Sequence, residues 1–348
     1  MNLKSVKITG LIILGIFFIL IWVLVFFNQG KKGIEVELLE ESQKENEIIG
    51  PEENKDVKDY SLEKSEIGKL PVAVVIDNFS ESWPLAGINM AAVVYETPVE
   101  ADITRLLAVF NQDFLPDKIG PVRSARPYLA EWAEEYGSLF IHSGGSQDFL
   151  EKIKTGEYQF YNLDEISYNG VYFWRDGLRD MPHNLYIYGE SIEKLIKDKR
   201  IDNQLKPNFI PRQFNETPVL NETTANLIVK INYREPVVWQ FDKASNRYLR
   251  FQNGRAFIDE NGVQTETANL MVQKTEIRIL DKIGHRFIET LGQGDALIFQ
   301  NGALTRGIWR KSDKTGQTVF YDLQDQEIKF LPGNIWVEIV SLDHQVLY

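Results

Sequence analysis

Two arginines and a glycine pair give the stretch KIGPVRSARPYLAEWAEEYGSLFIHSGGS, residues 118–146, the chemistry of an anion-binding site. Arg123 and Arg126 stand just before one expected helix, and HSGGS stands just before another. A guanidinium donates two parallel hydrogen bonds to a carboxylate or phosphate, and a helix start adds unpaired N–H groups. We therefore expect an anionic ligand here. In the alternative, the arginines pair with structural carboxylates such as Glu131 or Glu134, and GGS is an ordinary turn.

A second dense polar stretch, FWRDGLRDMPHNLY, covers residues 173–186. We expect the two stretches to form two walls of one site, together with polar residues near the ends of earlier strands. The predicted ligand-binding residues are Asp77, Asn78, Glu100, Arg105, Arg123, Ser124, Arg126, Gly144, Gly145, Ser146, Arg175, Arg179 and Asn184.

Histidine is the natural candidate for acid or base chemistry, because its pKa lies near neutrality. His142 and His183 lie in the two polar stretches, where Asp176 or Glu100 could orient a ring. The predicted catalytic residues are therefore His142, His183 and Asp176. In the alternative, His183 only fixes a turn through its hydrogen bonds.

Several other chemistries are disfavoured. Ser143 and Ser146 lack the nucleophile-elbow pattern of serine hydrolases. Cysteine is absent, which removes thiol catalysis, cysteine-based zinc sites and disulfides. No spacing of histidine and aspartate requires a metal, so we expect neither a metal nor a cofactor. The formal net charge of -12 argues against a nucleic-acid partner.

Alternating strands and helices are expected to position these residues within a first unit, residues 70–210. Apolar runs predict strands in PVAVVIDNF, MAAVVYE, ITRLLAVF and Leu139–Ile141, and helical spacing predicts helices over Ser124–Tyr136, Gln147–Lys154 and Glu190–Lys197. This order predicts an α/β unit with a mixed sheet. Polar residues at strand ends would then share one edge, where such sheets bind ligands.

A second, mostly-β unit is expected over residues 211–348. Short alternating runs such as LIVKINY, DALIFQ, ALTRGIWR and NIWVEIV are separated by Gly and Asn turns. Asn301-Gly302 predicts a hairpin turn. Trp239, Trp309 and Trp336 could line a sugar-binding face, but core or cross-strand packing is the favoured interpretation.

The N-terminal part predicts a membrane anchor and a spacer. After a short tail, residues 1–7, the run ITGLIILGIFFILIWVLVFF at residues 8–27 is long enough to span a bilayer. A cleavable signal peptide, the alternative, usually has a shorter apolar core and small residues at its cleavage site. A small excess of positive charge before the run favours an extracytoplasmic body. Residues 28–69 are acidic and poor in core-forming residues, which predicts a tether.

Blocks from both expected units resemble one known family. PVAVVIDN, VVYETPVEADITRLLAVF, KIGPVRSARPYL, HSGGS and YFWRDGLRDMPHNLY are similar to the YerB-like bacterial lipoprotein family, a cell-surface domain of unknown function with N- and C-terminal parts. The resemblance covers most of residues 70–348 and implies an extracytoplasmic location in a bacterium, without an established reaction. The lipid-bearing cysteine of the family is missing. Ala101-Asp102 stands where a glycine is expected, which affects the geometry around Glu100 and Arg105.

Three hypotheses follow. We favour a single-pass cell-membrane protein whose Arg/His pocket captures an anionic envelope ligand, namely a cell-wall fragment, a peptide carboxylate or a phosphate. The second is an envelope hydrolase or transferase acting on a peptidoglycan-like polymer, with His142 or His183 as acid/base and arginines stabilising developing negative charge. The third is a scaffold that docks envelope enzymes through the β unit. Loss of an arginine should abolish capture under the first, and loss of the histidine should stop turnover but not binding under the second.

Overall fold

The computed structural model describes residues 60–62, 68–168, 170–204, 212–214 and 227–348, which all lie in one compact unit, Lys58–Tyr348. The expected tail, the membrane anchor and most of the tether lie outside the described residues. Within the described ranges, no helix is long and apolar enough to cross a membrane.

The helical elements fall mainly in the first half of the described chain. The α-helices are α2 (Pro127–Glu134), α3 (Gln147–Thr155) and α4 (Gly189–Lys199), and the 3-10 turns are η2 (Ser80–Ser82), η3 (Ile88–Met90), η4 (Glu100–Asp102), η5 (Gln112–Phe114) and η6 (Glu165–Ser167). The strands are β1 (Val72–Asp77), β2 (Val93–Pro98), β3 (Thr104–Phe110), β4 (Lys118–Ile119), β5 (Leu139–His142), β6 (Tyr161–Asp164), β7 (Phe173–Arg175), β8 (Leu185–Tyr188), β9 (Ile228–Ile231), β10 (Val237–Asp242), β11 (Arg247–Gln252), β12 (Arg255–Ala256), β13 (Glu266–Thr267), β14 (Asn269–Thr275), β15 (Ile277–Ile279), β16 (Arg286–Ile288), β17 (Gly292–Gln300), β18 (Ala303–Lys311), β19 (Val319–Asp322), β20 (Ile335–Ser341) and β21 (Val346–Leu347).

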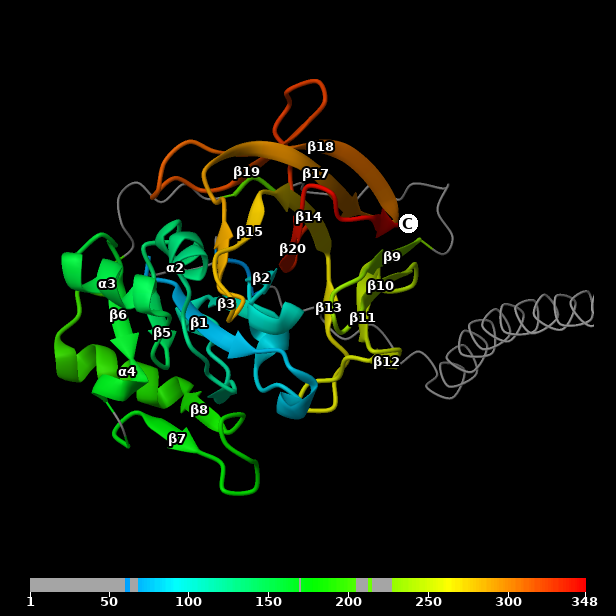
Figure 1. Cartoon of the computed structure of the whole chain (residues 1–348). Coiled ribbons are helices and arrows are strands. Elements are labelled where there is room, and N and C mark those ends of the chain that lie inside the picture. The colour runs from blue at the N-terminus through cyan, green and yellow to red at the C-terminus, as the bar shows by residue number, and fades with distance from the viewer. Residues whose placement is uncertain (1–59, 63–67, 169, 205–211, 215–226) are drawn as a thin grey trace, which may run out of the picture. The chain divides into compact units, whose positions relative to one another are not determined.

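The main sheet has ten strands in the order β19-β18-β17-β14-β20-β2-β3-β1-β5-β6 (Figure 1). β14, β20 and β2 are parallel neighbours, as are β1, β5 and β6, and β3 runs antiparallel between β2 and β1. The mixed sheet expected from the sequence is confirmed. It also extends further than expected, because strands of the mostly-β second half continue the same sheet beside β2.

Both faces of this sheet are covered, which explains why β1 is apolar at every position except its last residue. Val72, Val74 and Ile76 belong to a hydrophobic cluster shared with α4 and with the second sheet, β12-β11-β10-β9-β21. Ala73 and Val75 belong to the opposite cluster, shared with α2 and α3. Figure 1 shows the three helices gathered around β1, β5 and β6, whereas β17 and β18 (orange) arch over the other end of the sheet. Because successive side chains of a strand point to opposite faces, β1 contributes to one hydrophobic core on each face of the main sheet.

Two local predictions are confirmed. Asn301 and Gly302 adopt φ values of 54° and 67° in the turn between β17 and β18, as a two-residue hairpin requires. Trp239, Trp309 and Trp336 are at most 1% exposed, and the rings of Trp239 and Trp336 lie 5.1 Å apart. These tryptophans are core residues, and the sugar-face interpretation is wrong.

The helix expected over Ser124–Tyr136 is shorter than predicted, because α2 begins only at Pro127. Its first expected turn is used for strand-like pairing instead. The Ala125 N–H donates to the Gly144 carbonyl at 3.0 Å, and the Ser146 N–H donates to the Ala125 carbonyl at 3.2 Å. Extended backbone through this segment satisfies those groups as well as a helix would.

A buried ionic network lies between the two sheets. The Arg250 guanidinium donates to both oxygens of Glu96, at 3.0 and 2.8 Å, and both side chains are 0% exposed. Glu338 lies opposite Glu96 on β20 and accepts from Trp239 Nε1 at 2.8 Å and from the Tyr233 hydroxyl at 3.1 Å. Burial and the charge of Glu96 raise the pKa of Glu338 well above its ordinary value, which favours the protonated form of Glu338 in the folded protein.

A raised pKa of Glu338 predicts that Glu338→Gln increases the free energy of unfolding, relative to the parent, as the pH rises. Below about pH 4.3, the unfolded-state value for glutamate, both states of the parent hold the proton. Above it the unfolded state of the parent releases a proton that the folded state keeps, so the parent loses stability relative to the variant. Urea unfolding at pH 4 and pH 7.5 should show the variant gaining stability over the parent as the pH rises. A difference that stays constant with pH would mean that Glu338 is ionised in the folded protein.

Candidate functional site

Polar residues gather at the edge of the main sheet where its parallel strands end. Asp77 closes β1, Glu100 follows β2, and Asp164 closes β6. Because β1, β2, β5, β6 and β20 run in the same direction, their carboxyl ends share this edge. The structure thus brings to one edge residues that lie far apart in the sequence, from Asp77 to Asp164.

A buried aspartate organises the centre of the site. Asp77 is 1% exposed, and its Oδ2 lies 2.7 Å from His183 Nδ1 and 2.9 Å from Arg123 Nε. The Arg123 contact is an ion pair that is not aligned as a hydrogen bond. The other ring nitrogen of His183, Nε2, faces the exposed carboxylate of Glu81 at 3.5 Å. Asp77, rather than Asp176 or Glu100, is therefore the residue that orients His183.

Arg126 forms the second ion pair of the site. Its Nε and Nη2 each donate to one oxygen of Glu100 at 2.6 Å, in the two-pronged geometry typical of strong guanidinium–carboxylate pairs. Burial alone would raise the pKa of Glu100, but the hydrogen bonds and charge of Arg126 outweigh it and lower that pKa. The alternative partners do not take part, because Glu131 binds Lys152 and Glu134 accepts from the backbone N–H of Gln159.

Arg105 is the buried cation of the cluster. It is 4% exposed, donates from Nη1 to the Ser124 carbonyl at 2.9 Å, and leaves Nε without a hydrogen-bond partner. Burial, together with the positive charges of Arg126 and Arg123, lowers the pKa of Arg105 to about 10, against the raising effect of Asp77 and Glu100. In the described part of the chain, no carboxylate forms an ion pair with Arg105.

The HSGGS segment forms the neighbouring wall, but the amides of Ser143, Gly144 and Ser146 are already occupied. The Ser143 N–H donates to the Arg123 carbonyl, the Gly144 N–H to Asp164 Oδ1, and the Ser146 N–H to the Ala125 carbonyl. Gly145 lies tightly against Phe149, where an added Cβ would come within 2.3 Å of the ring. At the start of α3, the Asp148 carboxylate accepts from the Phe149 N–H and the Ser146 hydroxyl. The internal carboxylates therefore fill the anion site expected here.

His142 is buried and does not reach the protein surface. It is 0% exposed, between the rings of Phe140 and Phe149, and its nitrogens lie 2.8 Å from the Gly144 carbonyl and 2.7 Å from Asn162 Oδ1. Burial lowers the pKa of His142. With both nitrogens engaged and no exposed surface, His142 has the geometry of a structural residue, whereas His183 keeps contact with the surface.

Residues of the FWRDGLRDMPHNLY stretch contact the HSGGS segment through Glu165. Arg175 donates to Asn184 Oδ1 at 3.2 Å and lies 3.5 Å from Glu165, which in turn accepts from the Ser143 hydroxyl. The two expected walls are thus linked through Glu165. Three other predicted residues also have partners within the protein. Asp176 accepts from the Leu178 N–H, Arg179 donates to the carbonyls of Ser82 and Pro84, and Asn78 donates to Glu96 and Thr104.

The η4 loop holds Glu100 in place. Ala101 and Asp102 both adopt left-handed backbone conformations, with φ of 57° and 58°. The position where the resembled family has a glycine therefore keeps the backbone shape that glycine favours, although a side chain there carries a steric cost. Arg286 pairs with Asp102 and donates to the Val99 carbonyl at 2.8 Å, and Arg234 donates to the Ala101 carbonyl at 3.3 Å.

Several partners of the site were missed at the sequence level, including Asp164, Glu165, Glu81 and Arg234. Glu165 follows the polar-ended strand YNLD and could have been found by the same strand-end argument as Asp77. Glu81 and Arg234 lie in turns without a recognisable pattern. Across the described residues, no three His, Asp or Glu side chains are grouped to hold a metal ion.

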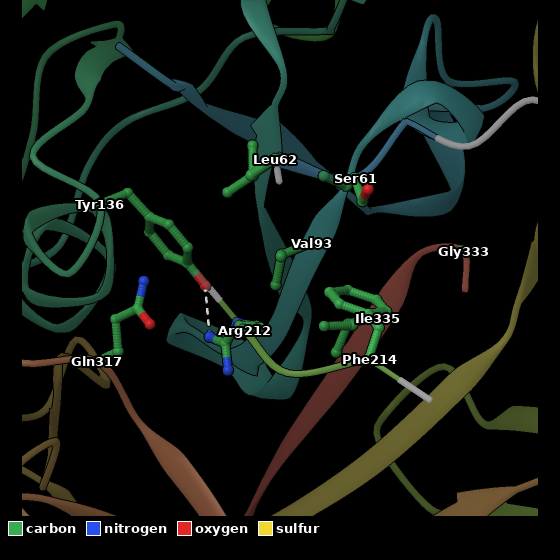
Figure 2. A pocket seen from close by; sticks show the side chains of 10 residues that line it. Ser61, Leu62, Val93, Tyr136, Arg212, Phe214, Gln317, Gly333 and Ile335 are labelled. Atoms are coloured by element: carbon green, nitrogen blue, oxygen red, sulfur yellow. Dashed lines mark hydrogen bonds between the residues drawn. The ribbon is translucent and has the colours of Figure 1, made fainter. Parts of the chain in front are cut away.

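A separate cavity near Arg212 is too small for a ligand. Figure 2 shows Tyr136, Arg212, Gln317 and Ile335 around it, with the Arg212 guanidinium donating to the Tyr136 hydroxyl at 2.9 Å. Its volume of about 10 Å³ holds a single water. This cavity therefore belongs to the packing of the core and not to the candidate site.

Comparison with known proteins finds relatives along most of the chain. Residues 60–202 match the family model described as the N-terminal domain of a protein of unknown function, DUF3048, and residues 228–337 match its C-terminal domain. The chain is 30% identical over 277 residues to "Putative lipoprotein YerB" of Bacillus subtilis strain 168, covering 78% of this chain and 81% of that protein. The crystal structure of the YerB protein from Bacillus subtilis matches with a TM-score of 0.71 and 28% identity, over 80% of this chain and 94% of the other.

Proposed function

Because the chain belongs to the DUF3048 family of YerB-like proteins, we propose that it is a membrane-anchored protein of the bacterial envelope that binds an anionic ligand at the carboxyl edge of its main sheet. A relative described as a lipoprotein supports the membrane-bound location. In this chain the apolar run at residues 8–27 takes the place of a lipid anchor.

The unbalanced charge of the arginine cluster carries the proposal. Arg105, Arg123 and Arg126 face two carboxylates, Asp77 and Glu100, and the buried Arg105 has neither an ion-pair partner nor a hydrogen bond at Nε. A buried charge that lacks a counter-ion is costly. An anion entering from solvent would complete the cluster and remove that cost, which is why a carboxylate or phosphate group is the ligand chemistry that fits.

Glu100 acts as the internal competitor of this ligand. It gives Arg126 the two-pronged contact that a ligand carboxylate would give, and it does so from a loop with two consecutive left-handed residues. Strained backbone of this kind is frequently found where a segment has to move or bind. An incoming anion would replace Glu100 at Arg126, and the η4 loop would turn outward.

The experiment is a titration of the full-length protein, in non-ionic detergent, with sodium sulfate. The thermal midpoint of unfolding is the readout, and sodium chloride at matched ionic strength is the control. Saturating sulfate, at a hundred times its dissociation constant, should stabilise the parent by roughly 2.7 kcal/mol. Arg126→Ala should abolish this shift. Glu100→Gln, which removes the competitor, should instead tighten sulfate binding by about tenfold, equivalent to roughly 1.4 kcal/mol.

A matched pair elsewhere controls for general effects of charge. Arg310 pairs with Asp325 on the exposed side of β18, so Arg310→Ala and Asp325→Asn change the net charge as the site variants do. Both should respond to sulfate as the parent does. If Glu100→Gln loses stability and gains no affinity for sulfate, the Arg126–Glu100 pair is purely structural and the proposal is wrong.

The Asp77–His183 contact favours acid/base catalysis as a second candidate function. A buried carboxylate that fixes Nδ1 and leaves Nε2 near the surface is the arrangement that a general base requires. His183→Ala separates the two functions. Under the binding function it weakens sulfate binding only slightly, whereas under the catalytic function it keeps ligand binding and stops turnover of an envelope polymer.

A further inference from the structure

A large cavity opens where β2 and β20 separate. The two strands pair in parallel only from Val93 opposite Ile335 to Glu96 opposite Glu338. Beyond that point β2 stays with β3 and β20 stays with β14, so the space between their carboxyl ends is left open. A cavity of about 690 Å³ lies at this split, within the roughly 300–1,000 Å³ typical of ligand pockets. Its walls come from four segments of the chain, and it is lined by Pro98, Ala101, Asp102, Asn232, Tyr233, Arg234, Ile277, Ile279, Arg286, Val340, Ser341, Asp343 and His344.

The cavity presents one cation and one anion that the fold does not pair with each other. Arg234 is exposed, donates to the Ala101 carbonyl and lies over the ring of Phe79, with no carboxylate partner among the described residues. Asp343 is exposed and accepts from the Ser341 hydroxyl at 2.7 Å, and no lysine or arginine of the described chain forms an ion pair with it. The other charged wall residues, Arg286 and Asp102, neutralise each other. A ligand with a negative and a positive end would match this pattern.

The uncharged walls fit a peptide better than a compact zwitterion. Ile277, Ile279 and Val340 provide apolar surface, and Asn232 and Ser341 provide hydrogen-bonding groups. Ile277 and Ile279 belong to the two-stranded β15-β16 sheet, which has no third strand within the described ranges. An exposed strand edge of this kind can pair with the backbone of an extended peptide.

We propose that this cavity binds a short peptide with free termini, whose carboxylate is held by Arg234 and whose ammonium group is held by Asp343. The site is separate from the Arg105–Arg123–Arg126 cluster, although the η4 loop borders both. The two residues that hold the peptide termini, Arg234 and Asp343, form no ion pair with that cluster. The cavity therefore adds a second ligand class, defined by both ends of the molecule.

Calorimetric titration of the full-length protein with tetra-alanine tests the assignment, using the free peptide, the C-terminally amidated peptide and the N-acetylated peptide. A hydrogen-bonded contact to a charged group contributes roughly 1.5–3 kcal/mol, so each blocked peptide should bind at least about tenfold more weakly than the free one. The Arg234→Ala variant should bind the free peptide more weakly than the parent does. It should bind the amidated peptide as tightly as it binds the free peptide. Asp343→Asn should likewise stop distinguishing the free peptide from the acetylated one.

Arg255→Ala serves as the control, because Arg255 is an exposed arginine on β12 outside the cavity lining, and it should behave as the parent does. Unchanged thermal midpoints establish that the variants are folded, as expected for exposed positions. Equal affinity for all three peptides, no measurable heat at millimolar peptide, or an Arg234→Ala variant that still discriminates against the amide would each overturn the assignment. Arg126→Ala should lose sulfate binding, whereas Arg234→Ala should keep it. Failure of the peptide proposal can therefore be distinguished from failure of the anion-site proposal.

Discussion

Replacement of Arg250 by methionine is expected to lower the free energy of unfolding by about 3–5 kcal/mol, because it leaves the buried charge of Glu96 without its partner. One guanidinium nitrogen, Nη2, reaches both oxygens of Glu96, both side chains are fully buried, and the guanidinium also lies 4.1 Å from the ring centre of Phe257. Urea denaturation followed by tryptophan fluorescence measures the loss, since Trp239 and Trp336 lie beside the pair.

A double variant identifies the source of that loss. With Glu96→Gln added to Arg250→Met, no buried charge remains at the pair, so the double variant should be more stable than Arg250→Met alone. Arg278 on β15 and Glu276 just before this strand form an ion pair that is about half exposed, and Arg278→Met should cost no more than about 1 kcal/mol. A loss below 1 kcal/mol for Arg250→Met would mean that Glu96 takes up a proton or gains water when its partner is removed.

Lys311→Met should have a similar effect at the opposite face of the main sheet. Lys311 and Glu135 are both 0% exposed and lie 3.0 Å apart, and Lys311 also donates to the Glu131 carbonyl at 2.9 Å. Removal of the ammonium group leaves the Glu135 carboxylate buried with only hydroxyl and amide donors. We expect a loss of about 3–5 kcal/mol in the same urea assay.

A neighbouring ion pair, which joins α3 to α2, provides the control. Lys152 lies 3.2 Å from Glu131, but its side chain is 34% exposed, so Lys152→Met should cost no more than about 1 kcal/mol. Equal losses for Lys311→Met and Lys152→Met would show that burial does not set the cost. Both buried pairs join one residue of the first expected unit to one of the second, which ties the stability of the two halves together.

The position of the site could be predicted because it depends on strand order. PVAVVIDNF has to be a buried strand, and a polar residue that ends such a strand lies at the edge of the sheet. The same argument places Glu100 after β2, as the structure has it. Local patterns likewise sufficed for the Asn301-Gly302 hairpin and for the buried tryptophans.

Pairing within the site could not be predicted, because it depends on contacts between distant segments. Glu131 and Glu134 are near Arg126 in sequence, but they belong to α2 and point to other partners, whereas Glu100 approaches from the η4 loop. His142 ends a strand as Asp77 does, yet Phe140 and Phe149 enclose it. Nothing in the local sequence distinguishes these two strand ends. The division into units at residues 210 and 211 also stays a prediction, since β2 and β20 share one sheet.

The place of β20 in the main sheet has a consequence for how the protein acquires its structure during synthesis. β2 is made early, but its parallel neighbour is β20, and Trp336 on that strand donates to Glu96 across 240 positions of sequence. A ribosome must therefore complete nearly the whole chain before the middle of the sheet can close. Until then β2 carries an unpaired edge, and contacts of such long range form slowly. A nascent chain that stalls before residue 335 would expose this edge to other chains, so rapid completion and release protect the protein from aggregation.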